Sequence, residues 1–294
     1  MRNFLPYILL VILALIWGSS FILMKEGLKA MTPVQMAAFR IFISGLVFWP
    51  LVYKHLKLFD RKDLPWAIAA GFIGSGIPAF LFAIAQTHVS SSIAGALNAL
   101  TPLFTLIVAY FFTSYVFNGS KILGVLIGLV GALLLIFLKG NGQFDAEFKY
   151  ALLIVGATTL YGININLIKV KLSKYKAIQI STIPLFSISV ICLFVFLFNG
   201  GTDFVTDLSG QKLRSIVSVT ILGFLGTSVG LLLFNRLIQL KSAIFSSSVT
   251  YLIPVVATFL GWIDNEQISM YQLIGLVLIL FGIYLINRRK TKLN

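Results

Sequence analysis

Two stretches of this 294-residue chain carry neutral polar side chains at helical spacing within otherwise apolar sequence. They span residues 90–104 and 242–256, and in each the small or polar residues recur at steps of four and three. Such steps place them on one face of a helix. The two faces comprise Ser91, Gly95, Asn98, Pro102 and Thr105 in the first copy, and Ala243, Ser247, Thr250, Pro254 and Ala257 in the second. Amides and hydroxyls donate and accept hydrogen bonds while staying neutral, so the pattern favours reversible binding of a polar solute.

Further polar and aromatic residues inside apolar runs extend this candidate binding site. Polar side chains in such runs also serve as helix–helix contacts, worth about 0.6 kcal/mol on average, and both interpretations stay open. The two prolines kink their helices, and the same kinks could act in gating. The candidate substrate contacts are Trp17, Ser20, Gln86, Asn98, Tyr161, Asn164 and Thr250, and the candidate kink or gating residues are Pro102 and Pro254.

Arg40 is the one cation expected inside an apolar run. It lies about 10 Å from the start of its span. A charge at that depth is costly unless it reaches the surface or finds a partner. Arg40 therefore contacts a substrate carboxylate, extends to the outer surface, or pairs with Glu26.

If the bound solute is moved across a membrane, the acidic residues indicate what could drive that movement. All nine Asp and Glu residues fall in loops or at the ends of apolar runs. Proton-driven exchangers usually need a buried acid, so facilitated diffusion or metabolite exchange is favoured. Cys192 stands alone within an apolar run. No nucleotide-binding loop or His/Asp/Glu metal cluster occurs, so we expect no cofactor, no metal and no catalytic residues.

The elements that position these residues are membrane-spanning helices. Charged residues make up 11% of the chain and apolar residues 59%. Runs of about 20 apolar residues recur along its length, which is enough to cross the hydrocarbon core. The sequence predicts an all-α membrane protein with ten transmembrane helices, at roughly 5–24, 34–53, 64–86, 91–113, 120–138, 149–169, 176–198, 213–235, 243–263 and 270–287.

The net charge of +14 orients the protein. Most of the 23 Lys and Arg residues fall in loops on one side of the expected spans. By the positive-inside rule this side is cytoplasmic and holds both termini. We therefore expect a multi-pass protein of the bacterial inner membrane whose basic residues contact lipid headgroups rather than nucleic acid.

The chain consists of two similar halves, 1–141 and 142–294. Pro102 and Pro254 are separated by the same number of residues as Gly71 and Gly223, which supports the duplication. Five spans per half is an odd number, so the second half enters the membrane inverted. Inverted five-helix repeats are typical of secondary transporters that work by alternating access.

These features resemble the EamA family of the drug/metabolite transporter superfamily. The resemblance is carried by Trp17-Gly-Ser-Ser-Phe21, by Arg40, and by the segment Tyr251–Trp262 followed by Glu266. It covers essentially the whole chain. It implies ten helices, cytoplasmic termini, a central cavity, and the movement of small metabolites such as amino acids, usually outward. The family often has a Glu after the fourth span, where this chain has Ser114-Tyr115; Glu266 keeps that position in the second half only, as a cap of the next helix or as a coupling group.

We therefore expect a permease or exporter for an amino acid or similar small solute, acting as a monomer or homodimer. A sugar-phosphate or nucleotide-sugar carrier is the alternative within transport, but it requires Lys or Arg deep in the later helices. An intramembrane lipid-processing enzyme requires paired acids or histidines within spans, and the sequence has none.

Overall fold

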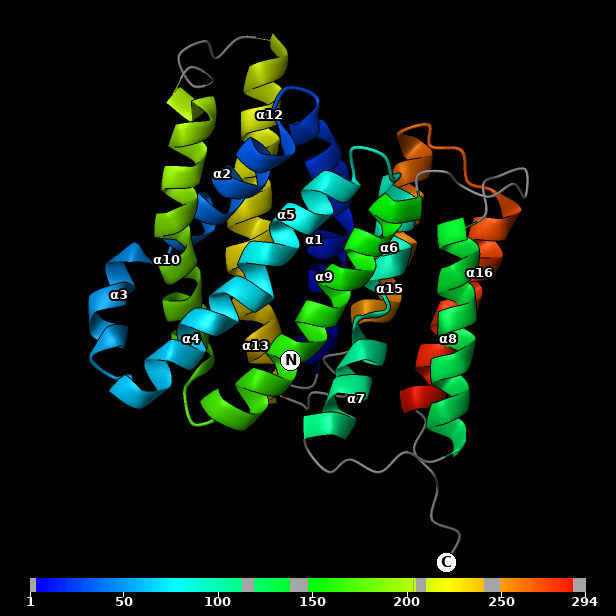
Figure 1. The fold of residues 1–294 in the computed structure, drawn as a ribbon, viewed down its shortest axis with the longest axis horizontal. Coiled ribbons are helices and arrows are strands. Elements are labelled where there is room, and N and C mark those ends of the chain that lie inside the picture. Colours follow the sequence, from blue (N-terminus) through cyan, green and yellow to red (C-terminus); the bar gives the residue numbers. More distant parts are fainter. Residues whose placement is uncertain are drawn as a thin grey trace, which may run out of the picture.

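The chain folds as a bundle of helices. The structure is a computed structural model that describes residues 4–112, 119–137, 148–202, 204, 210–240 and 249–287. No strand occurs within these ranges. Figure 1 shows the helices side by side, most of them running between two common ends of the molecule. The expected all-α class is confirmed.

Several helices consist of consecutive segments, some of them π-helical. The first part of the chain forms α1 (Leu5–Leu28), α2 (Pro33–Leu46), α3 (Trp49–Leu56), η1 (Arg61–Asp63), α4 (Leu64–Gly71), η2 (Phe72–Gly76), α5 (Ile77–Ala85), α6 (Ser91–Asn98), α7 (Thr101–Phe112) and α8 (Gly119–Phe137). The rest forms α9 (Phe148–Leu167), η3 (Ile168–Leu172), α10 (Ala177–Phe196), η4 (Leu197–Gly201), α12 (Gly210–Ile221), η5 (Leu222–Val229), α13 (Gly230–Leu240), α15 (Val249–Ile263) and α16 (Met270–Asn287).

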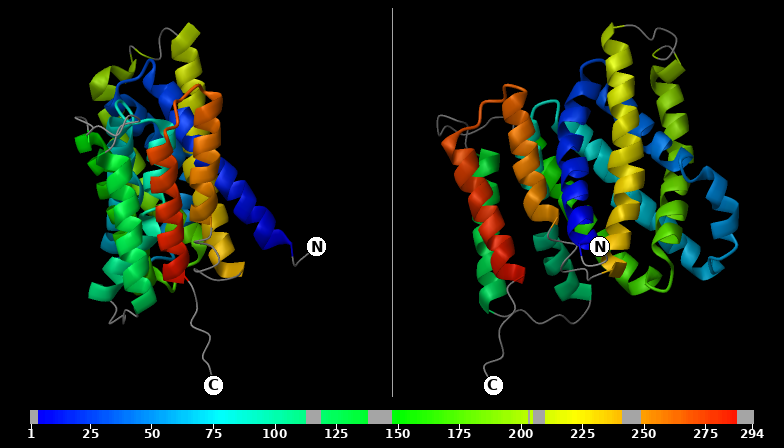
Figure 2. Two further views of the ribbon diagram at one scale, coloured as in Figure 1. Left: turned by 90° about the vertical axis from the view of Figure 1, so that its right-hand side faces the viewer. Right: turned by 180° about the vertical axis from the view of Figure 1, so that it is seen from behind.

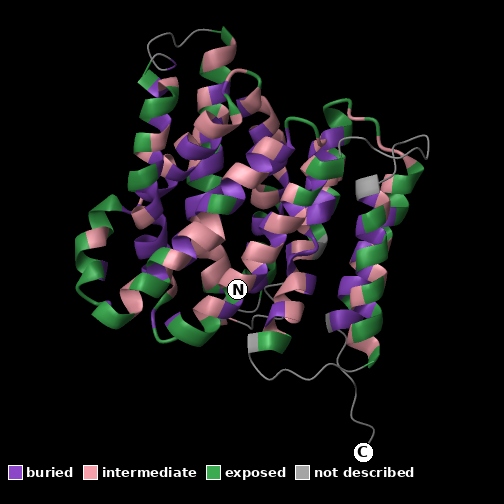
Figure 3. Cartoon of the chain, in the orientation of Figure 1, coloured by how far each residue is buried: buried purple, intermediate pink, exposed green. Residues whose placement is uncertain are grey.

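The described helices make this a multi-pass membrane protein. Six helical stretches, five of them made of consecutive elements, are long and apolar enough to cross a bilayer, and a seventh is added if α2 and α3 form one bent span. Three shorter apolar helices, residues 119–135, 252–263 and 270–286, accompany them. Large apolar side chains are exposed, as at Phe111 and Phe198, which are 74% and 86% exposed. Figure 3 shows exposed residues distributed along the described helices. Such a surface is stable against lipid rather than water.

The span expected over 34–53 is not one straight helix. α2 ends at Leu46, α3 begins at Trp49, and the two axes differ by 63°. Pro50 accounts for the break because its ring clashes with the carbonyl four residues earlier, that of Leu46.

The two proline-containing copies differ from one another, contrary to the expectation of two similar helices. Pro102 lies in the first turn of α7, and the chain turns through Ala99 and Leu100 after α6 ends at Asn98. Pro254 lies inside the continuous α15. The first copy is therefore broken at its proline. Residues 241–248 of the second copy lie outside the described residues.

Glycines allow α8 and α16 to pack closely, and Figure 2 shows the two helices side by side. A Cβ on Gly124 would lie 2.6 Å from the carbonyl oxygen of Gly282, and one on Gly131 would lie 2.6 Å from that of Gly275. No side chain fits between backbones at this separation. These glycines serve packing within the chain.

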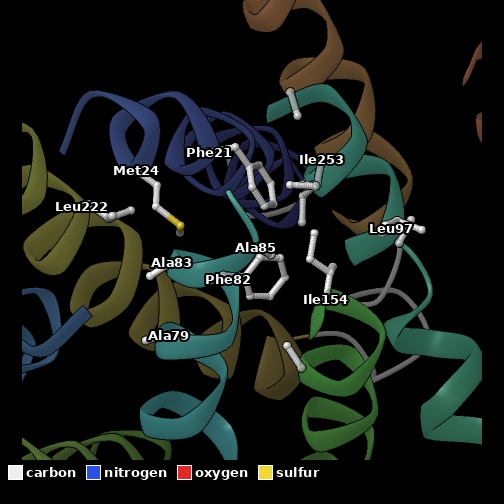
Figure 4. Packing of buried hydrophobic residues seen from close by; sticks show 14 of the residues in the cluster. Phe21, Met24, Ala79, Phe82, Ala83, Ala85, Leu97, Ile154, Leu222 and Ile253 are labelled. Atoms are coloured by element: carbon white, nitrogen blue, oxygen red, sulfur yellow. The ribbon is translucent and has the colours of Figure 1, made fainter. Parts of the chain in front are cut away.

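The largest hydrophobic cluster occupies the middle of the bundle. Figure 4 shows Phe21 of α1, Phe82 of α5, Ile154 of α9 and Ile253 of α15 in this cluster. The rings of Phe21 and Phe82 have centroids 5.9 Å apart. The core therefore joins helices from both ends of the sequence.

Candidate functional site

Trp17 of α1 is bound to a segment more than 200 residues away in sequence. Its Nε1 donates a hydrogen bond of 2.9 Å to the carbonyl of Gly226 in η5, and its ring packs against Phe234 with centroids 5.2 Å apart. A Cβ on Gly230 would lie 2.6 Å from the indole nitrogen, so the absence of a side chain there permits the approach. Ser20, one turn along α1, is buried and also faces Gly226. α1 thus presents Trp17 and Ser20 to η5.

Arg40 of α2 points into the bundle rather than toward Glu26. Its Nε donates a hydrogen bond of 3.1 Å to the hydroxyl of Thr227 in η5. Its guanidinium is also near enough to Tyr161 of α9 to interact with it electrostatically. Glu26 instead pairs with Lys29 at 2.5 Å. The expected alternative of an Arg40–Glu26 pair is therefore wrong.

Tyr161 and Asn164 lie one turn apart on α9. The Tyr161 ring stacks on Phe82 with centroids 6.2 Å apart. Asn164 packs against Gly74 of η2, and its buried Oδ1 has no hydrogen-bond partner among the described residues. A buried amide oxygen without a partner is uncommon in a folded protein, and it is available to a ligand donor.

These interactions bring together, around η5 and α9, four of the seven residues predicted to bind the substrate. We call the connected residues the central polar group. The central polar group consists of Trp17, Ser20, Arg40, Tyr161, Asn164 and Thr227.

The remaining predicted contacts lie at helix ends. Gln86 follows the last residue of α5, and its Nε2 donates to the carbonyl of Phe21 at 3.1 Å and to Ser91 at 3.3 Å. Asn98 is the half-buried last residue of α6. Thr250 is half-buried in the first turn of α15. No hydrogen bond described for Gln86 or Asn98 reaches the central polar group.

A buried carboxylate caps α6 at one end of the bundle. Glu266 accepts hydrogen bonds from the backbone N–H of Ser91 at 2.9 Å, from the N–H of Ser92 at 3.0 Å and from the Ser92 hydroxyl at 2.7 Å. Lys25 of α1 pairs with Glu266 at 3.1 Å and with Asp264 at 2.5 Å. We call Lys25, Ser91, Ser92, Asp264 and Glu266 the Glu266 cluster.

The local backbone directs Glu266 toward α6. Asn265 adopts a left-handed conformation (φ 61°), which ends α15. Burial by itself would raise the pKa of the Glu266 carboxyl, but the hydrogen bonds from Ser92 and Ser91 and the nearby Lys25 hold that pKa below its ordinary value. Glu266 therefore remains ionised in its buried position. α16, the next helix, is capped by Ser269 instead, whose hydroxyl accepts from the N–H of Gln272 at 3.2 Å.

A second charged cluster joins the turn between η3 and α10 to η1 and the residue before it. Lys174 pairs with Asp60 and, at 2.7 Å, with Asp63. The Tyr175 hydroxyl donates to Asp63 at 2.8 Å, and its ring stacks on Phe59 with centroids 3.9 Å apart. Hydrogen bonds to Asp60 and Asp63 raise the pKa of Lys174. We call Lys174, Asp60, Asp63 and Tyr175 the Lys174 cluster.

An outward-facing groove of about 410 Å³ lies between α1, the α12–η5 segment and α15. Among the described residues of its lining, Ser19 alone has a polar side chain. Leu15 and Phe259 on its walls are 54% and 57% exposed. The groove therefore faces lipid, and Gly226 separates it from the central polar group.

A sequence model of the EamA-like transporter family matches residues 4–137 and again residues 148–288. The chain belongs to the EamA-like transporter family. The resemblance expected from the sequence is confirmed, and the protein is a membrane transporter rather than an enzyme.

Similar proteins extend over nearly the whole of this EamA-like transporter. An uncharacterized transporter of Archaeoglobus fulgidus is 26% identical and aligns over 97% of this chain and 99% of its own. A probable amino-acid metabolite efflux pump of Escherichia coli is 24% identical over 95% and 93%. A probable terminal-alkyne amino-acid exporter of Streptantibioticus cattleyicolor is 21% identical over 95% and 92%. One solved crystal structure shares the fold with a TM-score of 0.65 at 16% identity, covering 95% of both chains.

Sequence reasoning missed two features of this EamA-like transporter. It noted Glu266 but considered it a cap of the following helix or a coupling group, because nothing local points to α6. It also overlooked Thr227 as the partner of Arg40. Thr227 and Ser75 occupy equivalent positions in the two halves, and this repeated hydroxyl was the available signal. Ser114 and Tyr115, which replace the family Glu, lie outside the described residues.

Proposed function

We propose that this EamA-like transporter exports an amino acid or a similar small solute by alternating access, with the central polar group as its binding site. The main support is that Trp17 and Arg40, in the first half of the chain, contact elements of the second half. Both residues donate hydrogen bonds to η5, and Arg40 also lies near Tyr161 of α9. The names of the Escherichia coli and Streptantibioticus cattleyicolor relatives, an efflux pump and an exporter, support outward movement of amino-acid compounds.

We further infer ten spans in two inverted halves, residues 1–141 and 142–294. In this proposal α2–α3 and α6–α7 each form one broken span, and α8, α15 and α16 cross as short helices. The packing supports it, because α1 packs against α15 as α9 packs against α7, while α2 pairs with α10 and α8 with α16. Inverted repeats that share a symmetry axis in the membrane plane produce this pattern.

The proposed orientation places both termini in the cytoplasm of a bacterial inner membrane. The start of α1 and the end of α16 lie toward the same end of the bundle, which agrees with it (Figure 2). The Lys25 end of α1 is then external, and the loop with Lys174 is cytoplasmic.

The two charged clusters then hold opposite ends of the transporter closed. Each joins one half to the other, since Lys25 and Ser91 meet Glu266, and Asp63 meets Lys174. In alternating access, the ion pairs of one cluster must break to open that end of the transporter while the other cluster keeps the opposite end closed. Within the described ranges every acid lies in a loop or near a helix end, so we propose uniport or metabolite exchange without proton coupling.

Transport by purified protein in proteoliposomes tests this function. We expect saturable counterflow of at least one labelled L-amino acid, and its loss in Asn164→Leu with folded protein retained. Lys57→Met, at the exposed end of α3 and outside both charged clusters, is the control and should retain counterflow. Counterflow unchanged by Asn164→Leu would remove Asn164 from the site, and no amino-acid flux at all would contradict the proposed substrate class.

A further inference from the structure

Arg40 is a cation inside the bundle that has no acidic partner among the residues that the structure describes. Every described acid that forms an ion pair is paired with a lysine and not with Arg40. Glu26 pairs with Lys29, Asp264 and Glu266 pair with Lys25, and Asp60 and Asp63 pair with Lys174. Among the described residues, no other charged side chain interacts electrostatically with Arg40, and its neighbour Tyr161 is a neutral phenol. The positive charge is therefore uncompensated.

The described hydrogen bonds use only one of the five N–H donors of the guanidinium. Nε donates to Thr227, which fixes the plane of the group from one side. The terminal nitrogens have no hydrogen-bond partner among the described residues. A planar fork with free donors matches the two oxygens of a carboxylate, which an arginine binds in a bidentate manner.

The surroundings of Arg40 fit a solute with one carboxylate better than a phosphate ester. A single arginine balances one negative charge, whereas a phosphate dianion would need a second base nearby. Asn164, one turn from Tyr161, offers an unpartnered buried oxygen to an ammonium or other donor. Tyr161, whose ring stacks on Phe82, places an aromatic ring near the guanidinium for the remainder of the solute.

We propose that the Arg40 guanidinium is the receptor for a carboxylate of the transported solute, an inference that rests on the transport function proposed above. Thr227 is a positioning residue that holds the guanidinium through Nε. We infer that this half-buried charge is retained for binding the solute, at a cost in stability while the site is empty.

Pairs of L-amino acids and their C-terminal amides test the inference, because each pair differs only in the carboxylate. Competition by both members against counterflow of a transported amino acid is measured in proteoliposomes. The wild type should be inhibited by the acid at a concentration at least about 30-fold lower than by the amide. Arg40→Gln should bring this ratio close to one, and Arg40→Lys should give an intermediate ratio because it keeps the charge and loses the fork.

Thermal stability of the ligand-free protein gives a readout that is independent of flux. Arg40→Met should raise the melting temperature, because it removes an unpaired charge and keeps an apolar stem of similar length. Thr227→Val keeps the arginine and should reduce the acid-to-amide preference less than Arg40→Gln does.

The two proposals fail in distinguishable ways. If amino acids are transported but the wild type does not distinguish acid from amide, or Arg40→Gln retains the preference, the carboxylate receptor is wrong while the transport function stands. A lower melting temperature in Arg40→Met together with an unchanged preference in Arg40→Lys would make Arg40 structural and also overturn it. If no amino acid or amide is transported, the proposed function fails and the inference fails with it.

Discussion

The two charged clusters use similar residues in different surroundings. In the Glu266 cluster the carboxylate side chain is 6% exposed and accepts three hydrogen bonds from the start of α6. In the Lys174 cluster the lysine is 48% exposed and Asp60 is 55% exposed. Exposed ion pairs contribute little because water and salt screen them, whereas removing one member of a buried pair is costly. The Glu266 cluster should therefore hold its end of the transporter much more firmly.

Glu266→Gln should have the largest effect on stability. The substitution removes the charge that faces Lys25 and two backbone N–H groups, so we expect a loss of about 2–3 kcal/mol in the free energy of unfolding. Thermal unfolding in detergent measures it as a lower melting temperature. Asp60→Asn is the matched control in the exposed cluster and should cost less than about 1 kcal/mol. Equal losses in the two variants would contradict the comparison.

The contribution of Glu266 should depend on pH. Its pKa is lowered in the folded protein, so the stabilisation is present above the ordinary carboxyl pKa and is lost as pH falls through the lowered value. The melting-temperature difference between wild type and Glu266→Gln should thus be constant near neutral pH and shrink on acidification. A difference that grows on acidification would mean that the carboxyl is protonated in the folded protein.

Ser92→Ala should have a smaller effect than Glu266→Gln. It removes one hydroxyl donor and leaves the two backbone donors and Lys25 on the carboxylate. A charge-assisted hydrogen bond is worth about 1.5–3 kcal/mol, and the remaining donors reduce the net loss to about 1 kcal/mol. A double-mutant cycle with Glu266→Gln measures the coupling, which should account for most of the Ser92→Ala loss. Zero coupling would show that the serine acts independently of Glu266.

Lys174→Met should have the smallest effect. The side chain is 48% exposed and its partner Asp60 is 55% exposed, while Asp63 keeps its hydrogen bond from Tyr175. We therefore expect a small change that decreases further in high salt. Unfolding at low and high salt measures it. A large loss of stability that does not depend on salt would show that the Lys174 cluster stabilises the protein as much as the Glu266 cluster does, and would contradict the comparison.

Much of the architecture could be predicted from the sequence because lipid imposes long apolar runs. The positions of the apolar runs alone locate α1, α9 and α10 within a few residues of their observed bounds. The helix breaks before Pro50 and Pro102 could not be predicted from the apolar runs. A proline interrupts some helices and, as at Pro254, lies within others. Packing decides between these outcomes, and the sequence does not contain it.

The candidate site was only partly predictable for a related reason. Trp17, Ser20, Tyr161 and Asn164 were identified as polar or aromatic residues inside apolar runs. Trp17 and Tyr161 are separated by the same number of residues as Ser20 and Asn164, which agrees with the repeat. Arg40 was noted, but its partner depends on how α2 packs against η5, over 180 residues away. Gln86 was chosen as a buried amide, and the fold uses that amide to join α5, α1 and α6. Chemical type predicts that a side chain needs a partner, and only the fold supplies its identity.

Side-specific labelling of the central polar group tests the account most directly. Asn164→Cys in a Cys192→Ser background is treated with a membrane-impermeant maleimide in right-side-out and in inverted vesicles. If the group is a binding site with alternating access, the new thiol should react from both sides, a transported amino acid should slow both reactions, and Glu266→Gln should accelerate the external one. A thiol that reacts from neither side, or whose reaction neither substrate nor Glu266→Gln changes, would contradict the account.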